Sequence, residues 1–434
     1  MDKNVDRLTL LSLNVETTTT ETADKMNQVY HMLHDYIFGA SNRTSRTSRV
    51  HRVVIVGGGL VGIMTAFYLT QEGYQVTVVE SKSFGAAASG RNGGGVLALG
   101  RELEEIPFVR VSMDLWEQLS EFGIDTQFIR PGHVMVAMNH VEAEKLGKAH
   151  ELYRLAGLET IFLEPDQVIK ILPDIHPQNR GALFSPIDGQ SYPFTTIASM
   201  IEWLKQRGVK FISHCEVTNF TVMNGMITAA QTEQGELTAD TFILCTGPWT
   251  QFAGKLLQLH LPIIPRRSQI MVTEILEQRR MDPFVSGNGL YLRQTHTGNI
   301  LYGGGGPWEV TSFDVTNTAK AIKLLSTRFI ELFPEYHMRH LIRSFAGTVE
   351  ITPDHFPLFG AIKEFTNLYV SGGYNGHGYG MSAIMGKLLS RMIAADHADK
   401  EIPLRIRELI GHFSPSRFAS GQTTEPKHGV NSYG

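Results

Sequence analysis

The chain has little of what marks several classes of protein. Only two of its 434 residues are cysteines, Cys215 and Cys245, which excludes a disulfide framework and a cysteine-rich metal or iron–sulfur site. No apolar run reaches the roughly 20 residues of a transmembrane helix. The net charge is −4, from 39 basic and 43 acidic side chains. Such a balance gives no general attraction for nucleic acid or for an anionic membrane surface.

Targeting and metal-binding signals are also absent from the N-terminal region. It begins MDKNVDRLTLLSLN, with Asp2 and Asp6 early and no apolar core ending in small residues, so we expect neither a secretory signal nor a transit peptide. His31 and His34 lie one helical turn apart, but a solvated helix face explains them better than half a metal site, and no metal is expected. Two thiols fit a reducing compartment, and we expect a cytoplasmic protein.

Glycine is abundant, and the chain is long enough for two or three domains. The 42 glycines make up about one residue in ten, against a usual level of about 7%, which favours tight turns and backbone packed against a ligand. Residues 1–50 differ from the rest. MNQVYHMLHDYIFGA predicts an amphipathic helix with Met26, Val29, Leu33 and Ile37 on one face, and SNRTSRTSR predicts a basic linker.

A glycine-rich turn follows the first strand predicted after this extension. Gly57, Gly59 and Gly62 form G-x-G-x-x-G. The first glycine makes the tight turn, the second lets the backbone approach a pyrophosphate, and the third lets helix and strand pack closely. Free N–H groups at the helix start then face the phosphates. The predicted elements are a strand, a helix and a second strand, at residues 53–56, 60–71 and 76–79.

Two further features identify the ligand class. Glu80 ends the second strand, 18 residues after the last glycine of the turn, where a carboxylate accepts hydrogen bonds from ribose hydroxyls and repels a 2′-phosphate. We therefore expect a bound dinucleotide, FAD or NAD. GAAASGRNGGGV at 85–96 favours FAD, because small residues let backbone lie against a flat ring, with Ser89, Arg91 and Asn92 as polar contacts. A glycine-rich turn without a cofactor is the alternative.

Seven further motifs follow in a fixed order. They are SGRNGGGV at 89–96, then GRELEEIPFVRVSMDLWEQL, PIDGQSYP at 186–193, CTGPWT at 245–250, YLRQTHTGNILYGGG at 291–305, FAGTVEITPDHFPLFG at 345–360 and LYVSGGYNGHGYGMSAIMG at 368–386. With the turn at 57–62, they resemble the FAD-dependent D-amino-acid oxidase superfamily over about residues 50–400. Within this superfamily, the chain resembles the branch that contains glycine oxidase, sarcosine oxidase β subunits, opine oxidase, the amine-oxidising subunit of hydrogen cyanide synthase and the L-proline dehydrogenase β subunit.

The resemblance implies the fold and its division. The expected class is α/β (α+β), with a Rossmann-like FAD-binding domain of the glutathione-reductase type and an inserted antiparallel-sheet substrate domain. We expect an N-terminal extension at 1–50 and a C-terminal tail at 401–434. The expected FAD-binding domain is discontinuous and comprises 51–135, 180–250 and 340–400; the substrate-binding domain comprises 136–179 and 251–339.

The resemblance also implies how the flavin is held. SGGYNGHGYG lies between a strand at 368–370 and a helix from about Met381, and its N–H groups would stabilise the reduced flavin. Monomeric sarcosine oxidases attach flavin to a cysteine where this chain has Gly347, so the FAD is expected to be non-covalent. The other expected cofactor residues are Leu60, Val61, Ser81, Lys82, Gly93, Gly94, Val217, Thr246, Gly247, Trp249, Gly347, Gly373, Asn375, Gly376, His377 and Gly378.

The implied chemistry is oxidation of a C–N bond in an amino acid or secondary amine, with hydride transfer to flavin N5 and hydrolysis of the imine. Tyr291 matches the family's substrate tyrosine, and Arg293 should face the same way. Arg101 and His377 are further candidates for substrate contact. Salt bridges are the alternative for the two arginines, and a turn histidine for His377. The resemblance would put the carboxylate-binding arginines of glycine oxidase at about Val349 and at about Gly376, and neither arginine is present.

The electron acceptor is O2 or another acceptor. Leu301 stands where sarcosine oxidases carry a lysine that helps oxygen react, which favours transfer to a partner or quinone. The alternative functions are therefore a dehydrogenase subunit of a hetero-oligomer and, in a different class, a non-catalytic flavin-binding subunit. An NAD-dependent dehydrogenase would not explain the glycine-rich segment near the C-terminus. A homo- or hetero-oligomer is possible for any of these.

Overall fold

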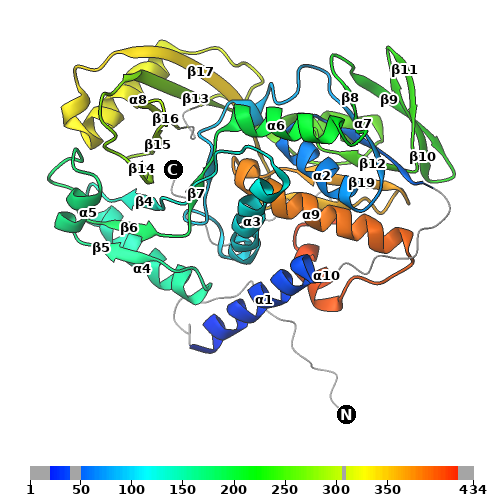
Figure 1. Ribbon diagram of the computed structural model, residues 1–434, viewed down its shortest axis with the longest axis horizontal. Coiled ribbons are helices and arrows are strands. Elements are labelled where there is room, and N and C mark those ends of the chain that lie inside the picture. Colours follow the sequence, from blue (N-terminus) through cyan, green and yellow to red (C-terminus); the bar gives the residue numbers. More distant parts are fainter. Residues whose placement is uncertain (1–19, 40–49, 305–308, 419–434) are drawn as a thin grey trace.

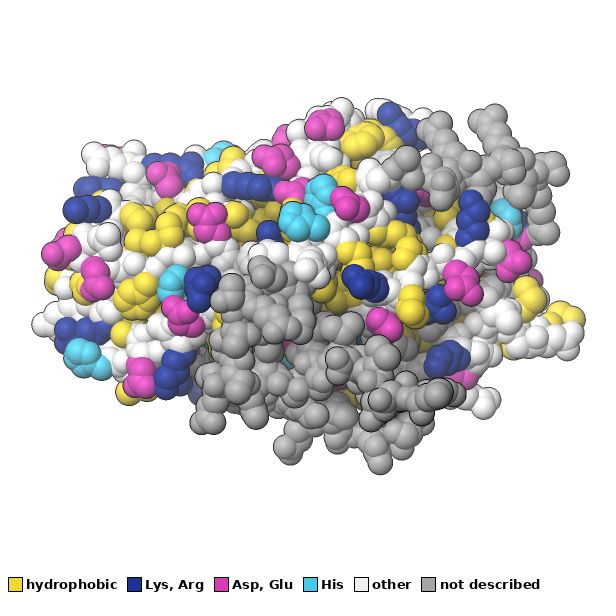
Figure 2. Space-filling view, turned by 90° about the horizontal axis from the view of Figure 1, so that it is seen from below, with side chains coloured by type: hydrophobic (Ala, Val, Ile, Leu, Met, Phe, Trp, Pro, Cys, Tyr) yellow, Lys and Arg dark blue, Asp and Glu magenta, His cyan; other side chains and the backbone are white. Residues whose placement is uncertain are grey.

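Two large β-sheets organise the chain in the computed structural model, which describes residues 20–39, 50–304 and 309–418 (Figure 1). A six-stranded sheet with helices α2, α3 and α9 forms one side of the molecule, and an eight-stranded sheet with α8 forms the other. The mixed α/β class expected from the sequence is confirmed. On the face seen in Figure 2, acidic and basic side chains are intermixed over the part that the structure describes.

The six-stranded sheet contains the predicted strand–turn–helix–strand unit. Its order is β18-β19-β12-β1-β2-β8, parallel except for β18. Strand β1 is apolar from Val53 onward because neighbours cover it on both faces. Helix α2 (Leu60–Gln71) has the predicted bounds, and Gly73 follows it with φ +88°. The strands are β1 (Arg52–Val56), β2 (Gln75–Val79), β8 (Lys210–Ile212), β12 (Thr241–Leu244), β18 (Leu358–Ala361) and β19 (Leu368–Gly372).

Helices on this sheet pack closely where small residues allow it. Gly386 of α9 lies against α2, since a Cβ there would be 2.8 Å from the carbonyl carbon of Met64. Such contact between two backbones requires glycine. Helices of this half of the molecule are α3 (Ile106–Gln118), α6 (Pro193–Lys205), α7 (Thr250–Leu256), α9 (Gly378–His397) and α10 (Leu404–Gly411).

The predicted N-terminal helix is confirmed as α1 (Thr20–Phe38). Met26, Leu33 and Ile37 are buried in the same core as α2, α3 and α9, as the spacing predicted. Arg391 of α9 donates hydrogen bonds to the carbonyls of Ile37 and Gly39, at 3.0 and 3.1 Å. The end of α1 is therefore fixed to the main body. The predicted basic linker falls on residues 40–49, outside the described residues.

The eight-stranded sheet has the order β17-β13-β16-β15-β14-β4-β6-β5, and α8 (Ala319–Leu332) packs on it through Leu325 and Phe329. The sheet was predicted to be antiparallel, and its neighbouring strands are antiparallel except for one pair, β4 and β14, which run parallel. A long connection separates these two strands, so no hairpin fixes their direction. The strands are β4 (His133–Val136), β5 (Ile161–Leu163), β6 (Ala182–Ser185), β13 (Ile264–Ile275), β14 (Phe284–Gly287), β15 (Leu290–Gln294), β16 (Asn299–Gly304) and β17 (Leu341–Ile351).

Smaller elements complete the described chain. They are a three-stranded sheet of β9 (Val217–Met223), β10 (Met226–Thr232) and β11 (Gly235–Thr238), a pair formed by β3 (Gly95–Val96) and β7 (Gly189–Gln190), and the helices α4 (His140–Leu155) and α5 (Pro165–Ile171). Residues 404–418 of the predicted tail fold as α10 and a short 3-10 helix, and bury Ile406, Phe413 and Phe418.

The predicted domain limits do not follow the sheets. Strands β6 and β17 were expected in the FAD-binding segments, but β6 pairs with β4 and β5, and β17 pairs with β13 along most of its length. The alternation of apolar residues shows where a strand lies but not which strand pairs with it. This is why the predicted domain limits differ from the division between the two sheets.

Candidate functional site

A cavity of about 1000 Å³ receives residues from both large sheets. Most of the predicted site residues line it. These are Gly57, Gly59, Val61, Glu80, Ser81, Lys82, Ser89, Arg91, Asn92, Gly93, Arg101, Val217, Thr246, Gly247, Trp249, Tyr291, Gly347, Asn375, Gly376, His377 and Gly378. Five predicted residues do not line it: Leu60, Gly62, Gly94, Gly373 and Arg293.

The turn between β1 and α2 has the geometry that its glycines predict. Gly57 has φ +111°, and a Cβ there would lie 2.2 Å from the carbonyl oxygen of Cys245. Gly62 faces away from the cavity, and a Cβ on it would lie 2.3 Å from the carbonyl oxygen of Gly57. Gly62 therefore acts through close packing rather than through contact with a ligand.

Glu80 ties this turn to the end of β2. One carboxylate oxygen accepts the N–H of Gly58 at 2.8 Å, and the other accepts the N–H of Lys82 at 2.8 Å. The carboxylate lies at the cavity wall and can accept further hydrogen bonds, because an ionised carboxylate has about four acceptor positions.

The segment after β2 forms a loop held by its own side chains. The amide of Asn92 donates to the carbonyls of Ala88 and Ser89 at 3.0 and 2.6 Å, and its oxygen accepts the N–H of Gly94 at 2.7 Å. Ser89 Oγ accepts the N–H of Leu60 at 2.9 Å. We call residues 88–94 the polar loop. Its shape is fixed by hydrogen bonds to itself and to the start of α2.

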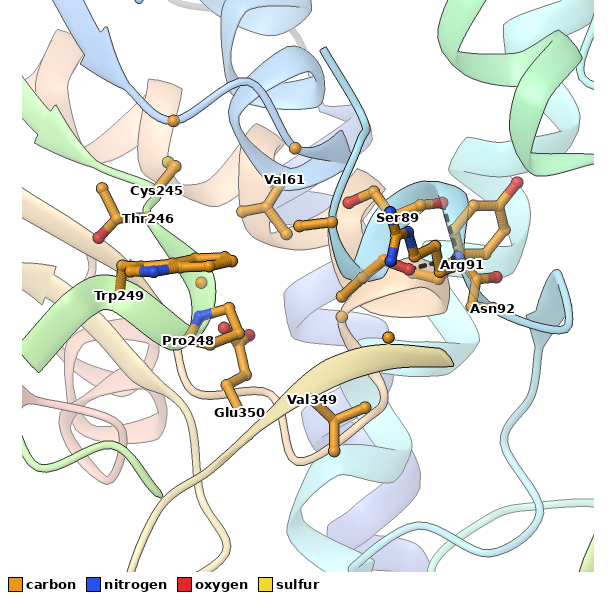
Figure 3. Close-up of a pocket in the computed structure, with 18 of the residues that line it drawn as sticks. Val61, Ser89, Arg91, Asn92, Cys245, Thr246, Pro248, Trp249, Val349 and Glu350 are labelled. Carbon is orange, nitrogen blue, oxygen red and sulfur yellow. Dashed lines mark hydrogen bonds between the residues drawn. The ribbon is translucent and has the colours of Figure 1, made fainter. Parts of the chain in front are cut away.

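Arg91 joins the polar loop to the second sheet. Its guanidinium donates to the carbonyl of Ala346 in β17 at 2.9 Å. A Cβ at the next residue, Gly347, would lie 3.1 Å from Cβ of Arg91. Figure 3 shows Arg91 and Asn92 on one side of the cavity and Thr246 and Trp249 on the other.

Tyr291 and Arg293 of β15 both face the polar loop, as strand alternation predicts. A Cβ at Gly93 would lie 3.0 Å from the Tyr291 ring, and one at Gly94 would lie 3.0 Å from Nη2 of Arg293. Tyr291 reaches the cavity, but Gly94 and its neighbours cover Arg293, which is 5% exposed. Burial lowers the pKa of Arg293. Arg293, which was expected to contact the substrate, is therefore not part of the cavity wall.

The C-terminal turn closes another side of the cavity. Helix α9 begins at Gly378, three residues before the predicted start, and His377 is its N-cap. Asn375 accepts hydrogen bonds from the N–H and hydroxyl of Thr352 at 2.9 and 3.2 Å. Arg101 is 3% exposed and donates to the carbonyls of Leu97 and His377, at 2.8 and 3.5 Å. Arg101 thus supports the turn from behind while lining the cavity.

Comparison with known proteins identifies the family. The family model described as DAO, FAD dependent oxidoreductase, matches residues 52–392. The chain belongs to this family. It is 26% identical over 392 residues to the sarcosine oxidase subunit beta of an Arthrobacter species, covering 87% of this chain and 93% of that protein. It is 27% identical over 337 residues to the glycine oxidase of Pseudomonas putida, covering 75% and 90%.

Solved structures show the same fold. The crystal structure of L-proline dehydrogenase from P. horikoshii superimposes with a TM-score of 0.79 at 25% identity, over 87% of this chain and all of that chain. The protein is therefore an FAD-dependent oxidoreductase. Among the residues described, no group of three or more His, Cys, Asp or Glu side chains is placed to hold a metal, and no helix is long and apolar enough to cross a membrane.

The cavity of this FAD-dependent oxidoreductase suits a large polar ligand. Gly376 has φ +86°, and a Cβ there would meet nothing within 4 Å, so the turn presents bare backbone to open space. Glu350 of β17 projects beside Pro248 and Trp249 (Figure 3). Its Oε2 atom is buried without a hydrogen-bond partner in the described part of the chain, while Oε1 accepts the N–H of Tyr374 at 3.1 Å. A buried acceptor of this kind needs a ligand or a proton.

Sequence reasoning missed several lining residues. Burial raises the pKa of Glu350 to about 7, so its carboxyl group is partly protonated near neutral pH. His355 has φ +62°, and burial lowers its pKa. Both lie inside motifs that the sequence analysis quoted, and the acidic character of Glu350 within an apolar strand was the available signal. Other unpredicted lining residues are Cys245, Arg266, Ser268, Phe284, Ser371 and Tyr379.

Proposed function

We propose that this protein oxidises the C–N bond of an amino acid or a secondary amine. The supporting observation is that Tyr291, the polar loop and the turn at 375–378 line one cavity with the dinucleotide turn. When bound, FAD would supply the redox chemistry: a hydride from the substrate α-carbon would be transferred to the flavin, and the resulting imine would be hydrolysed by water. The substrate amine reacts in its neutral form, so the site needs no strong side-chain base.

FAD binding follows from the residues of the cavity wall. Glu80 would accept hydrogen bonds from the ribose, and those N–H groups at the start of α2 that are not already bonded to Ser89 would bind the pyrophosphate. The polar loop and the residues before α9 hold the ring system. No thiol stands at Gly347, and we propose that FAD is bound without a covalent bond. Acid precipitation should therefore release all of the flavin into the supernatant.

The two halves of the molecule take separate tasks in this proposal. The six-stranded sheet and its helices form the FAD-binding domain, and the eight-stranded sheet forms the substrate-binding domain. Tyr291 is the substrate-contacting residue of the second domain. Arg101 and Arg293 are positioning residues in this scheme, because Arg101 holds the carbonyl of His377 and Arg293 lies behind Gly94. His377 lines the cavity and is a further candidate for contact with the substrate.

A second candidate function differs in the electron acceptor. Residue 301, in β16, is a leucine, so this chain offers no lysine there to assist O2. The Leu301 side chain is also not part of the cavity wall. Two relatives are named as subunits, of sarcosine oxidase and of hydrogen cyanide synthase. The alternative is a dehydrogenase subunit that passes electrons to a partner or a quinone.

One experiment separates these functions. The flavin absorbance of the purified protein is followed without air while amino acids and N-methyl amines are added, with the matching hydroxy acids as controls. Bleaching by an amine and not by its hydroxy analogue supports C–N oxidation. Recovery of the flavin bands when air is admitted identifies an oxidase, and slow recovery a dehydrogenase. If no amine bleaches the flavin, the proposal fails and a non-catalytic flavin-binding subunit replaces it.

A further inference from the structure

A single arginine side chain of β13 enters the cavity without a partner. Arg266 is partly buried and lines the cavity, and its side chain has no hydrogen bond or ion pair with any residue in the described ranges. Its neighbour Arg267 points to the other side of the strand and is fully engaged, donating to Glu309 at 2.8 Å and to Asp314 at 3.0 Å. Strand alternation thus separates a structural arginine from an unpaired one.

The position of Arg266 in the second sheet is fixed by the strand beside it. In the β13–β17 ladder Arg266 lies opposite Val349, and Ser268 lies opposite Gly347. Paired residues project to the same face of a sheet, with Cβ atoms about 5 Å apart. The family resemblance puts one of the missing carboxylate-binding arginines of glycine oxidase at about Val349. In this chain the residue opposite Val349 on the adjacent strand is an arginine.

The turn before α9 reaches the same region. Ile351 pairs with Ile264, two residues before Arg266, and the next residue, Thr352, is hydrogen-bonded to Asn375. Asn375 precedes Gly376, the second position at which the glycine oxidase pattern has an arginine. Burial and then the positive charge of Arg266 lower the pKa of His355, so these two side chains lie near each other. Arg266 thus lies opposite Val349, and it lines the same cavity as Gly376.

An unpaired guanidinium in a partly enclosed cavity is a binding group for an anion. Its planar donors match a carboxylate in bidentate fashion, and leaving it unpaired in low-dielectric surroundings costs free energy. We propose that Arg266 binds the carboxylate of the substrate, so that the enzyme selects α-amino acids over amines that lack this group. The Ser268 hydroxyl lies two residues away on the same face and supplies a further donor. This assignment rests on the proposed function.

The test measures binding and turnover separately in the FAD-loaded protein. Acetate, propionate and benzoate are titrated while the flavin spectrum is recorded, each beside its carboxamide. The variants are Arg266→Gln, Arg266→Lys and the control Arg343→Gln, which removes an exposed arginine of β17 in the same sheet. KM and kcat are then compared for each bleaching amino acid and for the amine without its carboxylate.

Loss of the guanidinium should weaken carboxylate binding and raise KM for amino acids about ten- to a hundredfold, as for a hydrogen-bonded ion pair. Carboxamides and amines without a carboxylate should be unaffected, Arg266→Lys should be intermediate, and Arg343→Gln should match the wild type. Equal carboxylate affinity in Arg266→Gln and wild type would overturn the assignment. So would loss of FAD in Arg266→Gln, which would place the guanidinium on the cofactor. Failure of every amine to bleach the wild type refutes the proposed function instead, and the carboxylate titration still decides the role of Arg266.

Discussion

Replacing Glu350 by Gln should change how stability depends on pH. Burial raises the pKa of Glu350 to about 7 in the folded protein, against about 4.3 in an unfolded chain. The neutral carboxyl is therefore the form that the fold prefers. The contribution of the neutral Glu350 carboxyl to the free energy of unfolding is fully present below pH ~4.3. It is lost as the pH rises towards 7, because in that range Glu350 ionises readily only in the unfolded chain. Above about pH 7 the loss is complete.

The size of the effect follows from the same values. A difference of about 2.7 between the two pKa values corresponds to at most about 3.7 kcal/mol, and water in the cavity reduces this to about 1–3 kcal/mol. Glu350→Gln keeps an acceptor for the N–H of Tyr374 and never ionises. Its stability relative to the wild type should therefore increase by that amount between pH 5 and pH 8.

The assay is urea unfolding at several pH values with FAD in fixed excess. Infrared spectroscopy provides a second readout, because a protonated carboxyl band should titrate near pH 7 in the wild type and lose intensity in Glu350→Gln. Glu105 is the matched control: burial also raises its pKa to about 7, but it does not line the cavity. Glu105→Gln should remove its own part of the band. A stability difference between wild type and Glu350→Gln that stays constant from pH 5 to pH 8 would refute the reasoning.

Three further predictions concern the proposed cofactor and substrate contacts. Glu80→Lys places a cation where a carboxylate accepts two N–H groups, and the purified protein should be mostly flavin-free by absorbance; full flavin content would contradict the ribose assignment. Tyr291→Phe should change the rate or apparent substrate affinity about three- to tenfold with FAD content unaltered, and unchanged kinetics would remove Tyr291 from the site. Gly57→Ala should abolish FAD binding, because its Cβ would lie 2.2 Å from a carbonyl oxygen. Gly225→Ala, at φ +73° with no atom within 4 Å, is the control, which should cost about 1 kcal/mol and retain FAD.

Local patterns in the sequence predict much of the fold. The bounds of α2, the strands beside it and the buried face of α1 all depend on residues close together in the chain, so periodicity and glycine position are sufficient. The partner of a strand is a different matter. Strand β6 pairs with β4 and β5, and β17 pairs with β13. The apolar alternation within a strand does not indicate which strand will be its partner.

The same limit applies to the site. Strand alternation correctly puts Tyr291 and Arg293 on one face, but only the folded chain shows that Arg293 is buried against Gly94 and does not line the cavity. The sequence did not mark Arg266 as a site residue, because its importance depends on how β13 and β17 pair, which sets Arg266 opposite Val349. For Glu350 the sequence offered only a weak signal, an acidic residue within a strand, and its importance became clear only once its burial was known.

The bond from Arg91 to the carbonyl of Ala346 spans 255 residues of sequence. During synthesis, the polar loop leaves the ribosome long before β17 exists, and α9 follows later still. The walls of the flavin cavity are consequently incomplete until nearly the whole chain has been made. FAD uptake then belongs to the last stage of maturation, and nascent chains that stop before β17 will carry no flavin, however well the dinucleotide turn has folded.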